Sequence, residues 1–156
     1  MNEHGIGSGV AIFVGKELVM QLKFKLDNRC SNNQAEQLAT AKTLEVIESI
    51  DILENSPRTV TIFTDSRITL DLLKNVNNHR YLIEVIRKRV SILEKDNWTI
   101  EFLWVMAHIG IYGNELADQL AKDAARNRDT VIAFNRIPKS TLYSETEEEA
   151  ILKCQK

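Results

Sequence analysis

The sequence predicts a mixed α/β domain, and three observations support that prediction. Stretches of alternating or β-branched apolar residues, typical of strands, are interleaved with stretches whose apolar residues recur at helical spacing. The expected order is strand, strand, helix, strand, helix, helix, strand, helix, which fits a layered sheet better than a helical bundle or a β-sandwich. The chain has 156 residues, of which 44% are hydrophobic, so it can bury one ordinary core.

The N-terminal third predicts a hairpin followed by a helix. Residues 10–14 form a short apolar run. Residues 18–26 alternate between apolar and mostly polar side chains, as in a strand with one solvent-exposed face. The Gly-Lys pair at 15–16 supplies the turn between them. Polar residues at 31–33 provide capping chemistry for a helix that runs from about residue 34 to residue 49.

The middle of the chain predicts a central strand and two helices. The β-branched run at 58–64 is typical of a central strand, and Asp65 or Ser66 can cap a helix that extends to about residue 75. An amphipathic helix follows over residues 82–93. The basic residues on its solvent-exposed side, here called the basic face, are Arg80, Arg87, Lys88 and Arg89. Such a face is more often solvated surface than a nucleic-acid contact, and the sequence leaves both interpretations open.

The stretch from residue 99 to residue 118 joins a strand, a glycine-punctuated loop and a helix. Residues 99–105 are β-branched and aromatic, which predicts a strand buried on both faces. Two glycines break this run, and Asn114 is a good N-cap for the helix that follows. Asp118 falls in or just beyond the first turn of that helix, where an acid can simply complement the helix dipole.

The periodic spacing of apolar residues weakens after residue 126, which suggests the end of the domain. We expect a domain over residues 1–126, a linker over 127–139, and a C-terminal helical tail that runs into the acidic stretch at 145–149. Together the linker and tail cover residues 127–156.

Composition excludes several classes of protein. No apolar run reaches the length of a membrane span, and the N-terminus lacks the basic and apolar blocks of a signal peptide, so we expect a soluble, intracellular protein. Whether that means cytoplasm or nucleus is open. Cys30 and Cys154 are too few for a disulfide framework and have no zinc-ligand spacing, so both are expected to be free thiols. A net charge of -2 does not by itself indicate a nucleic-acid partner.

Three acids stand at comparable places in these elements. Glu36 and Asp118 lie early in helices, whereas Asp65 lies at a strand end, and the intervals of 29 and 53 residues mean that only the fold could bring them together. Converging carboxylates repel one another unless a cation neutralises them, and hard oxygen ligands favour Mg²⁺ or Mn²⁺ over Zn²⁺. Such a site suits phosphodiester hydrolysis, in which His108 could carry a proton or aid product release.

Three blocks of the sequence resemble signature blocks of the type 1 ribonuclease H family. They are residues 30–36 (CSNNQAE), 62–66 (IFTDS) and 104–118 (WVMAHIGIYGNELAD), and the likeness spans about residues 5–126. The resemblance implies a ribonuclease H-like mixed sheet with helices on both faces. It also implies metal-dependent endonucleolytic cleavage of the RNA strand of RNA–DNA hybrids, using two Mg²⁺ ions.

The same resemblance assigns roles to individual residues. Glu36, Asp65 and Asp118 match three acidic metal ligands of the family, and His108 matches its mobile histidine. Substrate contacts are expected at residues of the same blocks, where 2′-hydroxyls distinguish RNA from DNA. These are Asn32, Asn33, Gln34, Ser66 and Asn114.

The likeness is greatest to ribonuclease H domains of non-LTR retrotransposon polyproteins, which implies a larger polyprotein that contains a reverse transcriptase. Two departures stand out. Ala107 replaces a common glycine, and the family's first block, a central strand ending in Asp-Gly-Ser, is absent because Met1 already falls in the loop that follows it. We therefore expect the first strand to be missing. The alternative function is a catalytically degenerate module that binds hybrids or a protein partner; a resolvase or integrase relative is disfavoured because its carboxylate motifs differ.

Overall fold

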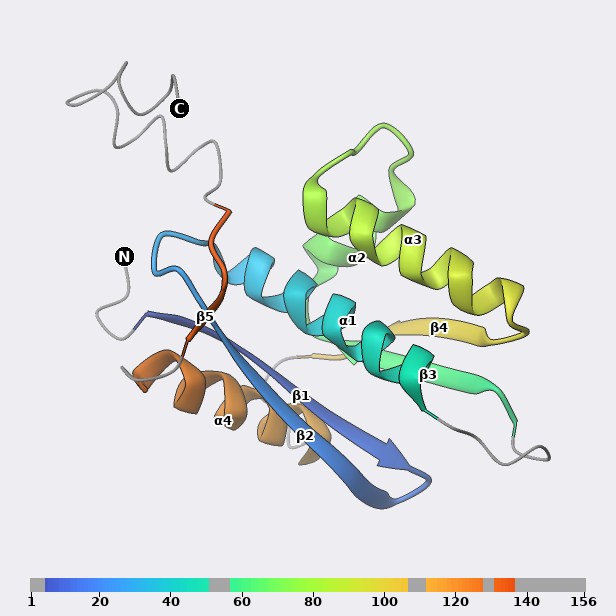
Figure 1. Ribbon diagram of the computed structural model, residues 1–156, viewed down its shortest axis with the longest axis horizontal. Coiled ribbons are helices and arrows are strands. Elements are labelled where there is room, and N and C mark those ends of the chain that lie inside the picture. The colour runs from blue at the N-terminus through green and yellow to red at the C-terminus, as the bar shows by residue number, and fades with distance from the viewer. Residues whose placement is uncertain (1–4, 51–56, 107–111, 128–130, 137–156) are drawn as a thin grey trace.

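The computed structural model describes residues 5–50, 57–106, 112–127 and 131–136, which build two small sheets with helices packed around them (Figure 1). In chain order the elements are β1 (Ile6–Val14), β2 (Glu17–Leu26), α1 (Asn32–Ser49), β3 (Thr59–Thr64), α2 (Arg67–Lys74), α3 (Tyr81–Lys95), β4 (Thr99–Trp104), α4 (Tyr112–Arg126) and β5 (Ile132–Phe134). The predicted order of elements is confirmed, and β5 is an addition to it.

The first sheet is a hairpin extended by one short strand. β1 and β2 pair antiparallel, and Gly15 makes the turn between them with a left-handed φ of 62°. On the other edge of β2, β5 pairs in parallel, with Lys25 opposite Ile132. β5 lies inside the segment that the sequence predicted as a linker.

The second sheet contains β3 and β4, which pair in parallel from Thr59 opposite Thr99 to Thr64 opposite Trp104. Among the described residues, no strand joins β1 to β3, so the strands form two sheets and not one five-stranded sheet. The strand predicted to be central, β3, therefore pairs on one edge only within this part of the chain.

Helices cover both faces of the hairpin sheet. The buried Ser8 hydroxyl donates a hydrogen bond of 2.6 Å to the carbonyl of Ala35 in α1. The next positions of β1 face the opposite way, toward α4, where a Cβ on Gly7 would lie 1.8 Å from the carbonyl oxygen of Ala121. Glycine at these positions therefore lets the backbone of α4 rest directly on β1.

α1 connects two clusters of buried apolar residues. One cluster lies between the hairpin sheet and the first half of α1, and contains Ile6, Leu26, Cys30, Ala35, Leu38 and Leu82. The other lies between α1, α3 and the second sheet, and contains Ala41, Leu44, Ile47, Ile62, Ile86 and Leu93. In Figure 1, α1 crosses the middle of the molecule, with α2 and α3 on one side and the hairpin on the other.

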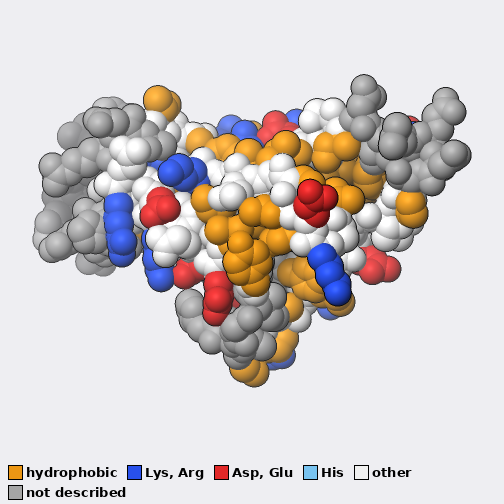
Figure 2. Space-filling view, turned by 90° about the horizontal axis from the view of Figure 1, so that it is seen from below, with side chains coloured by type: hydrophobic (Ala, Val, Ile, Leu, Met, Phe, Trp, Pro, Cys, Tyr) orange, Lys and Arg blue, Asp and Glu red, His pale blue; other side chains and the backbone are white. Residues whose placement is uncertain are grey.

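The expectation that the strand at 99–105 is buried on both faces is wrong. In β4, Leu103 is 48% exposed and Trp104 is 39% exposed. Only Ile100 and Phe102 pack against the second core cluster. The reason is tertiary, because within the described part of the chain α4 packs on β1 and β2 and makes few or no contacts with the β3–β4 sheet. Figure 2 shows hydrophobic side chains gathered on the face of the molecule that is seen from below.

Two further expectations concern composition. Cys30 is buried and forms no disulfide, as predicted, whereas Cys154 and the predicted C-terminal helix lie outside the described residues. Within the described ranges, no helix is both long enough and apolar enough to cross a membrane.

Candidate functional site

A groove of about 390 Å³ lies between the two sheets, with β1 along one side, β3 along the other, and α1 and α4 as its walls. The three acids that the sequence predicts as metal ligands all line it, together with Asn114. Each acid comes from a different element, so the fold brings together residues that are far apart in the chain.

Local structure explains the position of each acid. Glu36 lies in the second turn of α1, which starts at a capping box formed by Ser31 and Gln34. Asp65 follows the last residue of β3, at the carboxyl end where open α/β sheets place their ligands. Asp118 lies in the second turn of α4, which the glycines of β1 hold close to the hairpin.

The charges of these acids are coupled. The pKa of the half-buried Glu36 carboxyl is raised from 4.5 to about 7, first by burial and then by the negative charges of Asp65 and Asp118. Close to neutral pH, a large fraction of Glu36 therefore carries a proton. A divalent cation in the groove would remove the repulsion and favour the ionised carboxylate.

The carboxylates among the described residues nevertheless do not form a compact group of ligands. Within the part of the chain that the structure describes, no group of three or more acidic, histidine or cysteine side chains is close enough to hold an ion. Asp118 is also engaged, because its Oδ2 lies 3.0 Å from Nζ of Lys122 one helical turn later. The donor atoms fit a hard cation, and an ion that bound there would draw Asp118 away from Lys122.

Trp104 fixes the backbone beside Asp65. Its indole N–H donates to the carbonyl oxygen of Asp65 at 3.2 Å, and the N–H of Val105 donates to the carbonyl of Thr64 at 2.9 Å. The guanidinium of Arg67 lies 4.1 Å above the centre of the indole ring. A cation and an aromatic side chain therefore stand beside the acid at the end of β3.

The predicted substrate residues at the start of α1 differ in how free their side chains are. Asn32 is exposed and Asn33 half-buried. The Gln34 amide is occupied on both sides, since Oε1 accepts from the N–H of Ser31 at 2.9 Å and Nε2 donates to the carbonyl of Arg136 at 2.8 Å. In this structure Gln34 therefore links the start of α1 to the residues after β5 through hydrogen bonds.

The other two predicted substrate residues also have defined places. Ser66 is buried, and its hydroxyl caps α2 by accepting from the N–H of Thr69 at 3.2 Å. The expectation that Asn114 is an N-cap is wrong, because α4 already begins at Tyr112. The Tyr112 ring packs edge-on against Phe13 with ring centres 6.0 Å apart, and this long-range contact stabilises an earlier start. His108 lies outside the described residues.

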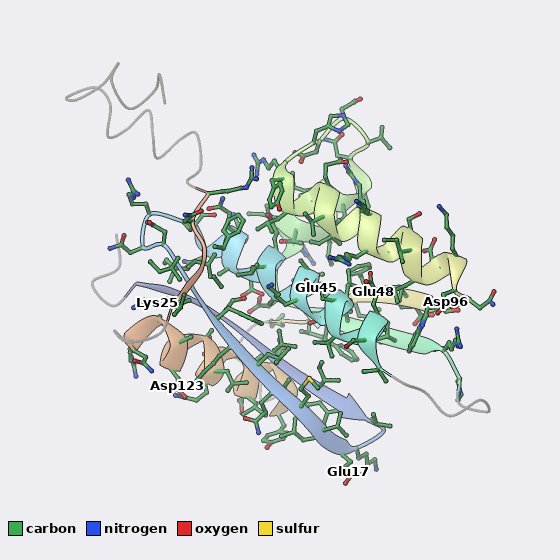
Figure 3. The ribbon with its side chains drawn as sticks, viewed as in Figure 1. Glu17, Lys25, Glu45, Glu48, Asp96 and Asp123 are labelled. Carbon is green, nitrogen blue, oxygen red and sulfur yellow. The ribbon has the colours of Figure 1, made fainter. Side chains whose placement is uncertain are left out.

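Two of the four residues of the predicted basic face of α3 make contacts inside the protein. Arg87 donates to the carbonyl oxygens of Leu72, Leu73 and Asn75, at the end of α2, over distances of 2.6 to 3.3 Å. Arg89 pairs with Glu48 at 2.8 Å, on the side of α1 that faces α3 (Figure 3). Arg87 and Arg89 thus connect α3 to α2 and α1. This weakens the interpretation that the basic face binds nucleic acid.

Comparison with known proteins decides the family. The family model for RNase H matches residues 1–126. The chain belongs to the RNase H family. A ribonuclease H of Ruthia magnifica subsp. Calyptogena magnifica is 32% identical over 103 residues, which cover 58% of this chain and 66% of that protein. The match therefore spans just under two thirds of the relative's length.

Two solved structures share the RNase H fold with this chain. RNase H1 from the halophilic archaeon Halobacterium salinarum NRC-1 superposes with a TM-score of 0.51 at 18% identity, covering 76% of this chain and 96% of that one. The foamy viral protease-reverse transcriptase in complex with dsDNA gives a TM-score of 0.51 at 19% identity, covering 79% and 95%. At these identities the likeness concerns the fold, and it confirms the predicted fold class.

Sequence reasoning assigned no role to three residues beside the predicted acids. Lys122 could have been found, because its spacing of four residues from Asp118 is that of a helical ion pair. Trp104 and Arg67 carried no such signal. Their contact depends on the pairing of β3 with β4, which brings together residues 37 positions apart in the chain.

Proposed function

We propose that this RNase H chain is a metal-dependent nuclease that hydrolyses the RNA strand of RNA–DNA hybrids. One observation carries the proposal: Glu36, Asp65 and Asp118, from three separate elements, line a single groove, where burial and then the charges of the two aspartates raise the pKa of Glu36 to about 7. A carboxyl group with a raised pKa beside two other acids in a groove is typical of sites that bind divalent metal ions and act on phosphates.

In this proposal the three carboxylates would hold Mg²⁺, or Mn²⁺ in its place. The ions would activate the attacking water and stabilise the leaving oxygen. The protein's own part is to place the acids on rigid elements, and Trp104 contributes by holding the carbonyl of Asp65. His108 would carry a proton or assist product release, as the family resemblance implies.

Substrate recognition would use the rim of the groove near the start of α1. Asn32 and Asn33 precede Glu36 by one helical turn and have the exposure that contact with 2′-hydroxyls requires. Asn114 lines the groove beside Asp118. For Gln34 and Ser66, a substrate role would have to coexist with the capping bonds that they make.

A second candidate function is a degenerate RNase H module that binds hybrids or a protein partner without cleavage. The observation that favours it is the unfinished site, in which Asp118 pairs with Lys122 and the described acids do not form a metal-holding cluster. We also propose a retrotransposon polyprotein context with a reverse transcriptase. The likeness to a foamy viral protease-reverse transcriptase supports that context.

A hybrid-cleavage assay in Mg²⁺ separates the two functions. The proposal predicts cleavage of the RNA strand that Asp65→Asn abolishes. Asp71→Asn, a matched change at an exposed acid of α2 outside the groove, should leave cleavage intact. If the unaltered chain binds hybrid but never cuts it, the degenerate module is correct. If Asp65→Asn cleaves as fast as the unaltered chain, the shared acid site is wrong.

A further inference from the structure

Residues 131–136 lie outside the stretch that the RNase H family model matches, which ends at residue 126. They nevertheless pack against the domain. β5 pairs with β2, and the N–H of Asp27 donates to the carbonyl of Phe134 at 2.8 Å. Figure 1 shows β5 and the residues that follow it passing beside the start of α1. The family match therefore assigns no role to this segment, although it lies next to part of the predicted substrate site.

The main chain of Arg136 is bound to the start of α1. Its carbonyl oxygen accepts hydrogen bonds from Nε2 of Gln34 at 2.8 Å and from the thiol of Cys30 at 3.7 Å. Asn32 and Asn33, which we expect to contact the 2′-hydroxyls of the substrate, directly precede Gln34 in the chain. Because a helix rises about 1.5 Å per residue, the main chain of Arg136 lies within about one helical turn of both asparagines.

The side chain of Arg136 is exposed and lies over an aromatic ring. Its guanidinium carbon is 3.7 Å from the centre of the Tyr81 ring at the start of α3, and the same ring stacks with Phe134 at a centre distance of 6.2 Å. In the part of the chain that the structure describes, no carboxylate pairs with Arg136. A guanidinium stacked on a ring keeps its in-plane N–H groups available to an anion. Tyr81 therefore positions the cation and leaves its donors free.

We propose that Arg136 is a substrate-binding residue, whose guanidinium binds a phosphate of the hybrid where the duplex passes the start of α1. The inference rests on the proposed nuclease function and extends its binding site beyond the matched family domain. Each strand of a duplex carries a phosphate about every 3.4 Å along the axis. A duplex that contacts Asn32 and Asn33 therefore brings phosphates past Arg136. Such a contact holds the substrate in place without reading its sequence.

The variants separate the charge of Arg136 from its main-chain contacts. Arg136→Met removes the cation but keeps the hydrogen bonds to Gln34 and Cys30, because the carbonyl oxygen of residue 136 accepts them. Arg136→Lys keeps the charge. Lys95→Met is the matched control, since Lys95 is an exposed cation about 20 Å from Tyr81, at the other end of α3. All three changes are made in an Asp65→Asn parent, so that the hybrid is not cleaved during the measurement.

Fluorescence anisotropy of a labelled RNA–DNA hybrid in Mg²⁺ gives the affinity over a range of KCl concentrations. Arg136→Met should weaken binding about threefold or more and lower the slope of log Kd against log salt by about one, because one phosphate contact is lost. Arg136→Lys and Lys95→Met should keep the slope of the parent. Equal slopes in Arg136→Met and the parent would overturn the inference, and so would a parent that does not bind the hybrid. The nuclease function is decided separately, by cleavage with the unaltered chain.

Hybrids that carry a single uncharged methylphosphonate locate the phosphate. The neutral group is moved along each strand, and every hybrid is bound to the parent and to Arg136→Met. At one position it should weaken binding to the parent about threefold or more and leave binding to Arg136→Met nearly unchanged, because that variant has already lost the contact. Parallel losses in both proteins at every position would contradict a direct contact between Arg136 and a phosphate.

Discussion

The indole N–H of Trp104 donates to the main-chain carbonyl of Asp65 at 3.2 Å, which links the end of β4 to the residue that follows β3. The Arg67 guanidinium stacks on the same ring, 4.1 Å from its centre. Two interactions of one side chain thus surround an acid that we assign to the metal site. They can be separated by substitution.

Trp104→Phe keeps an aromatic ring for Arg67 but removes the N–H that holds the Asp65 carbonyl. We expect a small loss of stability, about 1 kcal/mol, because the bond is partly exposed, and a several-fold weaker affinity for Mn²⁺. A Mn²⁺ titration followed by calorimetry measures the second effect. Arg67→Ala is the control, since it leaves the N–H bond in place. Equal losses of Mn²⁺ affinity in both variants would mean that the indole bond has no specific role.

Glu36→Gln should change how stability depends on pH. In the unaltered chain the folded-state pKa of Glu36, about 7, lies above the ordinary value of 4.5, so the folded state holds the proton more tightly. The associated stability is fully present below about pH 4.5 and is lost as the pH rises through 7. We expect a loss on the order of 2 to 3 kcal/mol between pH 5 and pH 8, which Glu36→Gln removes.

Urea unfolding at several pH values measures this difference, with Glu17→Gln as the control at an exposed acid of β2. Saturating Mg²⁺ should also reduce the pH dependence of the unaltered chain, because the cation stabilises the ionised carboxylate. If Glu36→Gln and the unaltered chain lose equal stability over this range, Glu36 does not carry a raised pKa.

Arg87→Met should destabilise the fold by about 2 kcal/mol, because it leaves several carbonyls at the end of α2 without their charged donor. Lys88→Met changes the neighbouring exposed residue and should stay within about 0.5 kcal/mol. Thermal unfolding compares the two variants. The opposite order of stabilities would return Arg87 to the solvated surface or to substrate binding.

Gly7→Ala should be among the most damaging small substitutions in the chain. The added Cβ would lie 1.8 Å from the carbonyl oxygen of Ala121, so α4 must move away from β1. We expect a cost of about 3 kcal/mol or more. Gly15→Asn is the matched control, since a Cβ at Gly15 meets nothing within 4 Å and asparagine tolerates its left-handed backbone. Circular dichroism melts would show whether Gly7 is instead tolerant.

The elements of the fold follow from local patterns in the sequence. The alternation of residues 18–26 and the helical spacing after Ser31 are short-range properties, and the hairpin and α1 form where those patterns predict them. β5 could not be predicted, because three residues carry no period, and its pairing with β2 is a contact across about a hundred positions.

The candidate site follows from the sequence only in part. The three acids were identifiable by their places in the elements, and the groove contains all of them. The engagement of Gln34 and the early start of α4 at Tyr112 depend on long-range contacts with the carbonyl of Arg136 and the ring of Phe13. The pairing of Asp118 with Lys122 is instead a local contact at helical spacing. No local pattern specifies these two long-range contacts.

The most direct measurement for the central claim is the melting temperature across a Mn²⁺ titration. If Glu36, Asp65 and Asp118 share one metal site, bound Mn²⁺ stabilises the folded chain by about 2.7 kcal/mol at a hundred times its dissociation constant, and the melting temperature rises accordingly. Asp65→Asn should abolish that rise, whereas Asp71→Asn should preserve it. An equal Mn²⁺-dependent rise in Asp65→Asn, or no rise in the unaltered chain, would contradict the shared metal site.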